Sequence, residues 1–169
     1  KLYKEAADEG DAYAKWKLSR AYFWGEGVEV DERKGFRLLE EAANAGLEEA
    51  KAGLACCYIG GFSTKPDIAK GKKMMDSLVE TSTNAFVLSS YAGMLMSGYP
   101  AYEKNEKKAI KILESVDDKD NPFYLYDMGL VYYNGIDNDV DYQKALEYFS
   151  KAFERGRFLG AYYCGGIYY

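Results

Sequence analysis

The chain has 169 residues, of which 48% are hydrophobic and 29% charged; it is long enough for one domain with a core, and wholesale disorder is excluded. Its net charge of −5 and isoelectric point near 4.9 argue against a nucleic-acid partner, because an acidic chain repels phosphate backbones. It contains no histidine, which removes the commonest general base, the serine and cysteine triads and the usual zinc ligands.

One pattern recurs along the whole chain at steps of 36 to 38 residues. A bulky residue at Tyr22, a small one at Ser19 and a glycine at Gly25 each have equivalents in later periods. The aligned columns are Tyr22, Tyr58, Leu95, Tyr132 and Tyr168; Ser19, Ala55, Ala92, Gly129 and Gly165; and Gly25, Gly61, Gly98 and Gly135. Bulky residues four apart with a small neighbour predict a helix with one close-contact position, which the glycine ends.

A second block follows each of these glycines. It begins with an aspartate or asparagine, whose side-chain oxygen can accept a hydrogen bond from an orphan N–H and so predicts the N-cap of a second helix. Its columns are Asp31, Asp67, Asn105 and Asp141; Lys34, Lys70, Lys108 and Lys144; Gly35, Gly71, Ala109 and Ala145; and Leu39, Met75, Leu113 and Phe149. We interpret the acid and lysine columns as caps and first-turn residues; a ladder of charges for a partner is the alternative.

Each unit is therefore predicted to be a helix, a short loop, a second helix and a turn. The units are residues 1–10, 11–46, 47–83, 84–120, 121–156 and 157–169. The first is the end of a second helix and the last is the start of a first helix. We therefore expect a single repeat domain that is a fragment of a longer array. The third unit carries one extra residue in its loop around residues 99–104, where an insertion is tolerated.

Two segments invite other interpretations. Residues 81–102 carry no charge, but their apolar part, residues 85–96, is too short to span a bilayer and predicts a buried helix without membrane insertion. Cys56 and Cys57 are adjacent and Cys164 is distant, so the three cysteines cannot form a closed disulfide set. Their apolar and small neighbours favour buried free thiols, which inclines the compartment toward the cytoplasm.

Signals for chemistry are absent from the sequence pattern. Asp137–Asp141 resembles the start of a calcium loop, but the glycine and glutamate that the loop requires are replaced by Tyr142 and Tyr148. The paired glycines at Gly60 and Gly165 lack a following Gly-Lys-Ser/Thr, so no phosphate cradle is indicated. The lysines of residues 70–73 and 104–111 are best explained as a solvated face of second helices. We predict no catalytic residue, no cofactor and no metal site.

At this point the units resemble the Sel-1-like repeat, a branch of the tetratricopeptide-like α-solenoids. The first unit carries the resemblance most fully, and the fourth keeps much of it, while the second, third and fourth have lost the G-x-G-V loop. The matching residues of the first unit are Ala14, Leu18, Tyr22, Gly25, Gly27, Val28, Asp31, Lys34, Ala42, Ala43 and Gly46. The resemblance implies an all-α fold, a right-handed superhelix of antiparallel helix pairs, that serves as an adaptor or scaffold for other proteins. No unit has a cysteine in both helices, so the chain departs from the secreted, disulfide-stapled branch of the family.

In tetratricopeptide-like solenoids the first helix of each unit lines the concave groove. We therefore expect a peptide or partner loop to bind aromatic residues on that face. The predicted partner-binding residues are Tyr13, Trp16, Arg20, Phe23, Trp24, Phe86, Met96, Phe123, Tyr126, Leu130, Tyr133 and Tyr162. The alternative is that these aromatics only pack between neighbouring helices.

The function predicted from the sequence is a non-catalytic protein-binding scaffold. One alternative is a structural spacer whose activity lies in a domain outside these residues; its groove aromatics would be packed on one another. Another is a hydrolase with a carboxylate-based site in the groove. The identity of the partner and the oligomeric state are left open.

Overall fold

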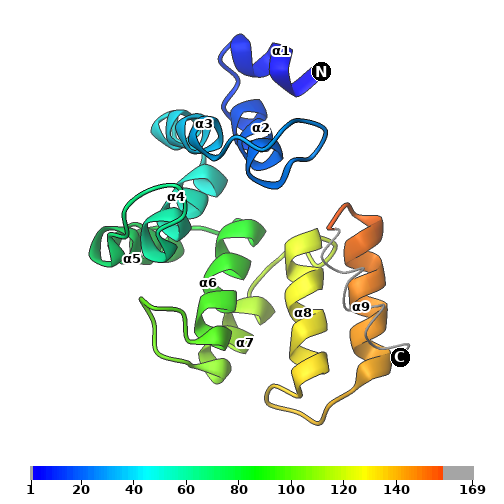
Figure 1. Cartoon of the computed structure of the whole chain (residues 1–169). Coiled ribbons are helices and arrows are strands. Elements are labelled where there is room, and N and C mark those ends of the chain that lie inside the picture. The colour runs from blue at the N-terminus through cyan, green and yellow to red at the C-terminus, as the bar shows by residue number, and fades with distance from the viewer. Residues whose placement is uncertain (1, 158–169) are drawn as a thin grey trace. The chain divides into compact units, whose positions relative to one another are not determined.

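A computed structural model describes residues 2–157 of the chain (Figure 1). These residues contain α-helices and no strand, which confirms the all-α fold class. The chain divides into two compact parts, Lys1–Ser82 and Thr83–Tyr169, called here the N-terminal and C-terminal halves. The division falls close to the boundary between the second and third units of the sequence pattern.

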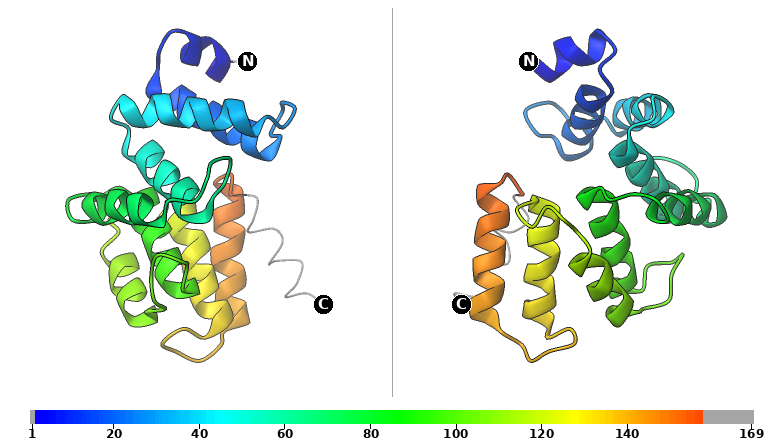
Figure 2. Two further views of the ribbon diagram at one scale, coloured as in Figure 1. Left: turned by 60° about the vertical axis from the view of Figure 1, so that its left-hand side comes forward. Right: turned by 180° about the vertical axis from the view of Figure 1, so that it is seen from behind.

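Nine helices lie within the described residues, and they alternate between the two helices of each unit. The N-terminal half holds α1 (Leu2–Asp8), α2 (Ala12–Trp24), α3 (Glu32–Asn44), α4 (Glu48–Gly60) and α5 (Ile68–Val79). The C-terminal half holds α6 (Ala85–Ser97), α7 (Glu106–Glu114), α8 (Pro122–Asn134) and α9 (Tyr142–Glu154). Repeats 1 to 4 are the packed pairs α2–α3, α4–α5, α6–α7 and α8–α9. Figure 2 shows the pairing of α8 and α9 from two further directions.

The acid column caps the second helix of every repeat, as predicted. The side-chain oxygens of Asp31, Asp67, Asn105 and Asp141 accept the backbone N–H three residues on, at 2.9–3.0 Å. The N–H of each capping residue also donates to a carbonyl of the first helix, as in the 2.8 Å bond from Asp67 to Tyr58. Each capping residue therefore starts the second helix and bonds it to the first. These two structural roles account for the acid column without a binding partner.

Each glycine of the glycine column ends a first helix and adopts the left-handed backbone conformation, which favours glycine. Gly25, Gly61, Gly98 and Gly135 have φ between 64° and 71°, and each donates its N–H to the carbonyl four residues earlier. A residue with a Cβ is strained at such φ values. The glycine stops inferred from the sequence are confirmed.

The lysine column binds the aromatic ring of the first helix in its own repeat. The Nζ atoms of Lys34, Lys70 and Lys144 lie 4.5, 3.9 and 4.2 Å from the ring centroids of Tyr22, Tyr58 and Tyr132. In repeat 3 the tyrosine is replaced by Leu95, and Lys108 instead donates to the hydroxyl of Tyr91 at 2.8 Å. The lysine and tyrosine columns thus form one clamp between paired helices.

Small residues let the paired helices approach. Ser19, Ala55 and Ala92 are fully buried, and a Cβ placed on Gly129 would lie 2.5 Å from a ring carbon of Phe149. The second helices contribute the apolar column to the core: Leu39, Met75, Leu113 and Phe149 are at most 3% exposed. The predicted close-contact position is confirmed.

The structure also tests the interpretations of the cysteines and of the uncharged segment. Cys57 is buried and Cys56 half-buried, both are free, and burial raises the pKa of their thiols to about 11 and about 12. Both thiols are free, as predicted, but only Cys57 is buried as predicted; Cys164 lies outside the described residues. Across residues 2–157, none of the helices has the length and apolar character needed to cross a bilayer.

Candidate partner-binding face

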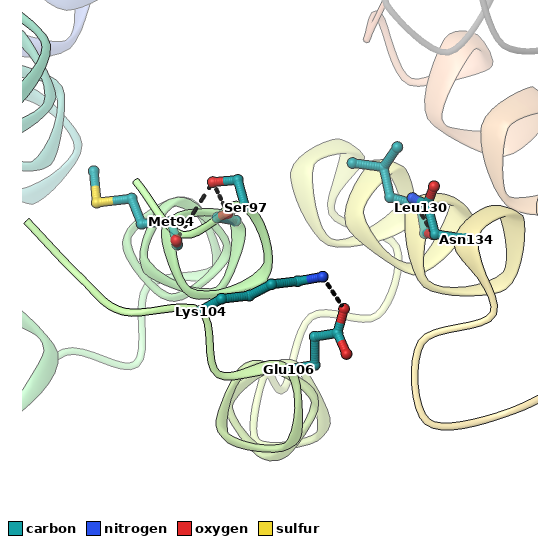
Figure 3. A network of polar contacts seen from close by, with 7 residues as sticks. Met94, Ser97, Lys104, Glu106, Leu130 and Asn134 are labelled. Carbon is teal, nitrogen blue, oxygen red and sulfur yellow. Dashed lines mark hydrogen bonds and ion pairs between the residues drawn. The ribbon is translucent and has the colours of Figure 1, made fainter. Parts of the chain in front are cut away.

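The first helix of each repeat presents one face away from the second helix, and we call this its A face. In Figure 3 the side chain of Ser97 on α6 lies on the side of its helix opposite α7, which begins at Glu106. The Ser97 hydroxyl donates to the Gly93 carbonyl and the Asn134 amide to the Leu130 carbonyl, both at 2.9 Å. These two polar side chains therefore bond to carbonyls of their own helices.

On α2 the A face carries a stripe of aromatic and basic side chains. Tyr13, Lys17, Arg20 and Trp24 follow one another at spacings of four, three and four residues, which places them along one side of the helix. Tyr13 is 45% exposed and Trp24 is 72% exposed. Two aromatic rings therefore flank two cations on an accessible helix surface, which we call the α2 stripe.

Trp16 lies beneath this stripe. It is only 3% exposed, and its ring is 5.4 Å from that of Tyr13. The Lys17 ammonium lies 4.7 Å from the Trp16 ring centroid and the Arg20 guanidinium carbon lies 5.6 Å from it. The Trp16 ring thus packs against both cations. Burial lowers the pKa of Arg20, and the charges of Glu26 and Tyr13 oppose this effect.

The rest of the N-terminal A face has smaller or packed side chains. Phe23 is half-buried, and its ring packs against α3 at Gly35, where an added Cβ would lie 3.1 Å from it. On α4, Ala52 and Ile59 are buried. Within the first helices of this half, α2 and α4, the exposed large aromatic side chains are therefore Tyr13 and Trp24.

In the C-terminal half the predicted face residues are packed on neighbouring helices. Phe86 of α6 and Phe123 of α8 meet edge to face with centroids 4.6 Å apart. Tyr126 and Tyr133 lie 5.8 and 6.3 Å from the ring of Phe149 on α9. The Phe86–Phe123 contact joins repeats 3 and 4, whereas the two tyrosine contacts join the two helices of repeat 4.

The predicted partner-binding residues thus fall into groups. Tyr13 and Trp24 are exposed; Arg20, Phe23, Phe86, Phe123, Tyr126, Leu130 and Tyr133 are half-buried; Trp16 and Met96 are buried; and Tyr162 lies outside the described residues. The burial of Trp16 and Met96 gives them packing roles in this structure. Binding itself stays a prediction for all of them.

Sequence reasoning missed Asp127, which is only 8% exposed on α8. Burial raises the pKa of its carboxyl to about 7, although the charge of Arg157 and the hydroxyl of Ser89 act to lower it. The guanidinium of Arg157 also covers the ring of Phe123 at 4.8 Å. A signal was available, because Asp127 is the one charged residue in α8.

Solved structures similar to this chain share its fold. A Sel1 repeat protein from Oxalobacter formigenes is 20% identical with a TM-score of 0.59, covering 94% of this chain and 64% of its own. A protective antigen of uropathogenic Escherichia coli with an SLR fold is 21% identical with a TM-score of 0.56, covering 98% of this chain and 35% of its own. A putative Sel1 repeat protein from Klebsiella pneumoniae is 18% identical with a TM-score of 0.59, covering 99% of this chain and 82% of its own. This chain therefore spans less than two thirds of the first two. A search of the curated proteins found no match.

The family comparison agrees with the period in the sequence. The family described as Sel1 repeat matches residues 12–47, 48–77 and 122–156, which correspond to repeats 1, 2 and 4. Repeat 3 is not matched, although α6 and α7 pack as a pair like the others. Since the matches cover more than half of the sequence, the chain belongs to the Sel1 repeat family, whose members generally serve as protein–protein interaction scaffolds.

Proposed function

We propose that this chain is a non-catalytic scaffold that binds a segment of a partner protein on the A face of α2. The observation that carries the proposal is the exposure of Trp24, at 72%, in one stripe with the exposed Tyr13. Large aromatic side chains with polar tips are the commonest anchors of protein interfaces. Their exposure on a helix of a scaffold family supports a binding role.

The C-terminal half supports a different role for the same positions. There Phe86 packs on Phe123, and Tyr133 packs on Phe149 and Tyr142. This packing favours the spacer interpretation for repeats 3 and 4, which hold their own helices in place. The binding role is therefore assigned to α2.

The test is capture from a lysate of the source cells with the immobilised chain, read by quantitative mass spectrometry. Wild type is compared with Trp24→Ala, Tyr13→Ala and the control Phe153→Ala. Phe153 lies on α9 and is 45% exposed, the same fraction as Tyr13, so it controls for loss of an exposed ring. Circular dichroism checks that each variant is folded.

We expect Trp24→Ala to weaken capture by roughly 2 kcal/mol, the cost typical of an interface hot spot. Phe153→Ala should capture the same partner as wild type. A partner retained equally by Trp24→Ala and Tyr13→Ala would contradict the proposal, and so would capture no better than that of an unrelated protein.

A further inference from the structure

The α2 stripe is basic within an acidic protein. The chain has a net charge of −5, yet α2 holds Lys15, Lys17 and Arg20 and no acidic residue. Among the helices of residues 2–157, α2 alone combines cations with a lack of Asp and Glu. Lys15 turns toward α3, where its Nζ lies 2.8 Å from Glu41. The other two cations of the helix, Lys17 and Arg20, lie in the stripe, and the charge of Glu26 also acts on Arg20.

The cations of the stripe are held in place. Lys17 lies 5.2 Å from the Tyr13 ring and 4.7 Å from the Trp16 ring, and Arg20 also lies over Trp16. A side chain ordered on a ring loses less rotamer freedom when it meets a ligand. The Arg20 guanidinium has five N–H donors and the Lys17 ammonium has three, and both groups bind carboxylates.

The spacing of the stripe sets the length of a matching segment. From Tyr13 to Trp24 the helix rises about 16 Å, at 1.5 Å per residue. An extended peptide covers that length in about five residues. A segment with an apolar side chain at each end and carboxylates between them would meet rings and cations in the order in which α2 presents them.

We infer that the partner segment bound by the α2 stripe is acidic, with two apolar anchors about five residues apart and Asp or Glu between them. The anchors contact Tyr13 and Trp24, and the carboxylates pair with Lys17 and Arg20. This inference rests on the proposed function and adds the chemistry of the partner. A nucleic acid is the less suitable occupant, because two cations in a chain of net charge −5 supply few phosphate contacts.

The experiment uses three random pools of peptides of about twelve residues, long enough to exceed the stripe. All pools contain Phe, Leu, Tyr, Ser and Gly; one adds Asp and Glu, one Asn and Gln, and one Lys and Arg. The immobilised full chain selects from each pool, and mass spectrometry reads the enrichment. Selected peptides are then titrated against tryptophan emission, which reports on α2 alone because both tryptophans of the chain, Trp16 and Trp24, lie on it.

The variants isolate the two cations. Lys17→Gln/Arg20→Gln removes them, and Lys73→Gln/Lys111→Gln removes two lysines from the second helices α5 and α7 with the same change in net charge. Lys17→Glu/Arg20→Glu reverses the stripe. Thermal unfolding followed by circular dichroism verifies the fold of each protein.

We expect wild type and the Lys73/Lys111 control to enrich the acidic pool. Loss of both cations should weaken binding of the selected peptides at least tenfold, as expected for charge-assisted contacts. The reversed variant should select the basic pool instead. Those three results together support the inference.

Other outcomes overturn it in distinguishable ways. Enrichment of the amide or basic pool by wild type, lost in Trp24→Ala, would reject the acidic partner while the proposed function stands. Acidic peptides that bind Lys17→Gln/Arg20→Gln as tightly as wild type would have the same meaning. No enrichment from any pool would reject both the acidic segment and peptide binding on α2.

Discussion

The first helices of repeats 1 and 4, α2 and α8, follow one register and use it in opposite ways. Lys17 of α2 and Asp127 of α8 occupy the same column. Lys17 lies over aromatic rings in the stripe, whereas Asp127 is 8% exposed and has a pKa raised to about 7. Tyr13 is accessible, whereas its equivalent Phe123 packs on Phe86.

Two features of a repeat protein, the register of the repeat and the packing of each helix, therefore act separately. The register decides which positions share a face of the helix. The residue type and the neighbouring helix decide whether that face is exposed or packed. The exposure of the A face therefore has to be determined for each repeat separately.

The largest expected effect concerns the buried carboxyl of Asp127. Its folded-state pKa of about 7 exceeds the ordinary value of 3.8, so the protonated form is favoured on folding. The resulting stability is complete below about pH 3.8 and is lost as the pH rises toward 7. Asp127→Asn should therefore raise the free energy of unfolding at pH 8, by at most about 4 kcal/mol, with little difference from wild type near pH 4.

Urea unfolding of wild type and Asp127→Asn across this pH range checks the prediction, with Lys17→Gln as the control in the same column. Burial of Asp127 against Ser89 and Arg157 would be in doubt if the difference between the two proteins did not change with pH. The control should not reproduce that change.

The next effect concerns the close-contact column, where α2 has Ser19 and α8 has Gly129. A methyl group on Gly129 would lie 2.5 Å from the buried ring of Phe149, so Gly129→Ala should cost about 2 kcal/mol through overpacking. Ser19→Ala removes only the 2.8 Å bond to the Trp16 carbonyl and should cost about 1 kcal/mol or less. Equal costs in urea unfolding would show that the two helix pairs do not differ in this contact.

The smallest effect concerns a feature that the two repeats share. Lys34→Met and Lys144→Met each remove a cation from a tyrosine ring and keep most of the aliphatic stem. Because the clamps have similar geometry, both variants should lower the urea midpoint slightly and to a similar extent. A loss confined to one repeat would mean that the clamp is not equivalent in the two.

The features that the sequence predicts correctly are local. Asp31 and its equivalents cap helices three residues on, and Gly25 and its equivalents end the preceding helices, so each depends on a few neighbouring residues. The period then places whole helices in pairs. These rules suffice for the fold and for the family.

The candidate site could be predicted only in part, because burial depends on a second helix. Tyr133 is predicted on the A face, yet it lies against Phe149 and Tyr142 of α9. The rotation of one helix against another cannot be derived from the residue pattern of a single helix. Met96 and Trp16, which the sequence predicts on the same face as Trp24 and Tyr13, are buried. The burial of Asp127 requires knowledge of Ser89 and Arg157 beside it.

Binding on α2 and not on α8 can be tested with the two helices side by side. The most direct measurement is isothermal titration of the captured partner segment into wild type, Trp24→Ala and Tyr133→Ala. We expect a loss of affinity of roughly thirtyfold for Trp24→Ala, the equivalent of about 2 kcal/mol, and wild-type affinity for a folded Tyr133→Ala. Wild-type affinity for Trp24→Ala together with a loss for Tyr133→Ala would contradict this expectation and assign the site to the C-terminal half.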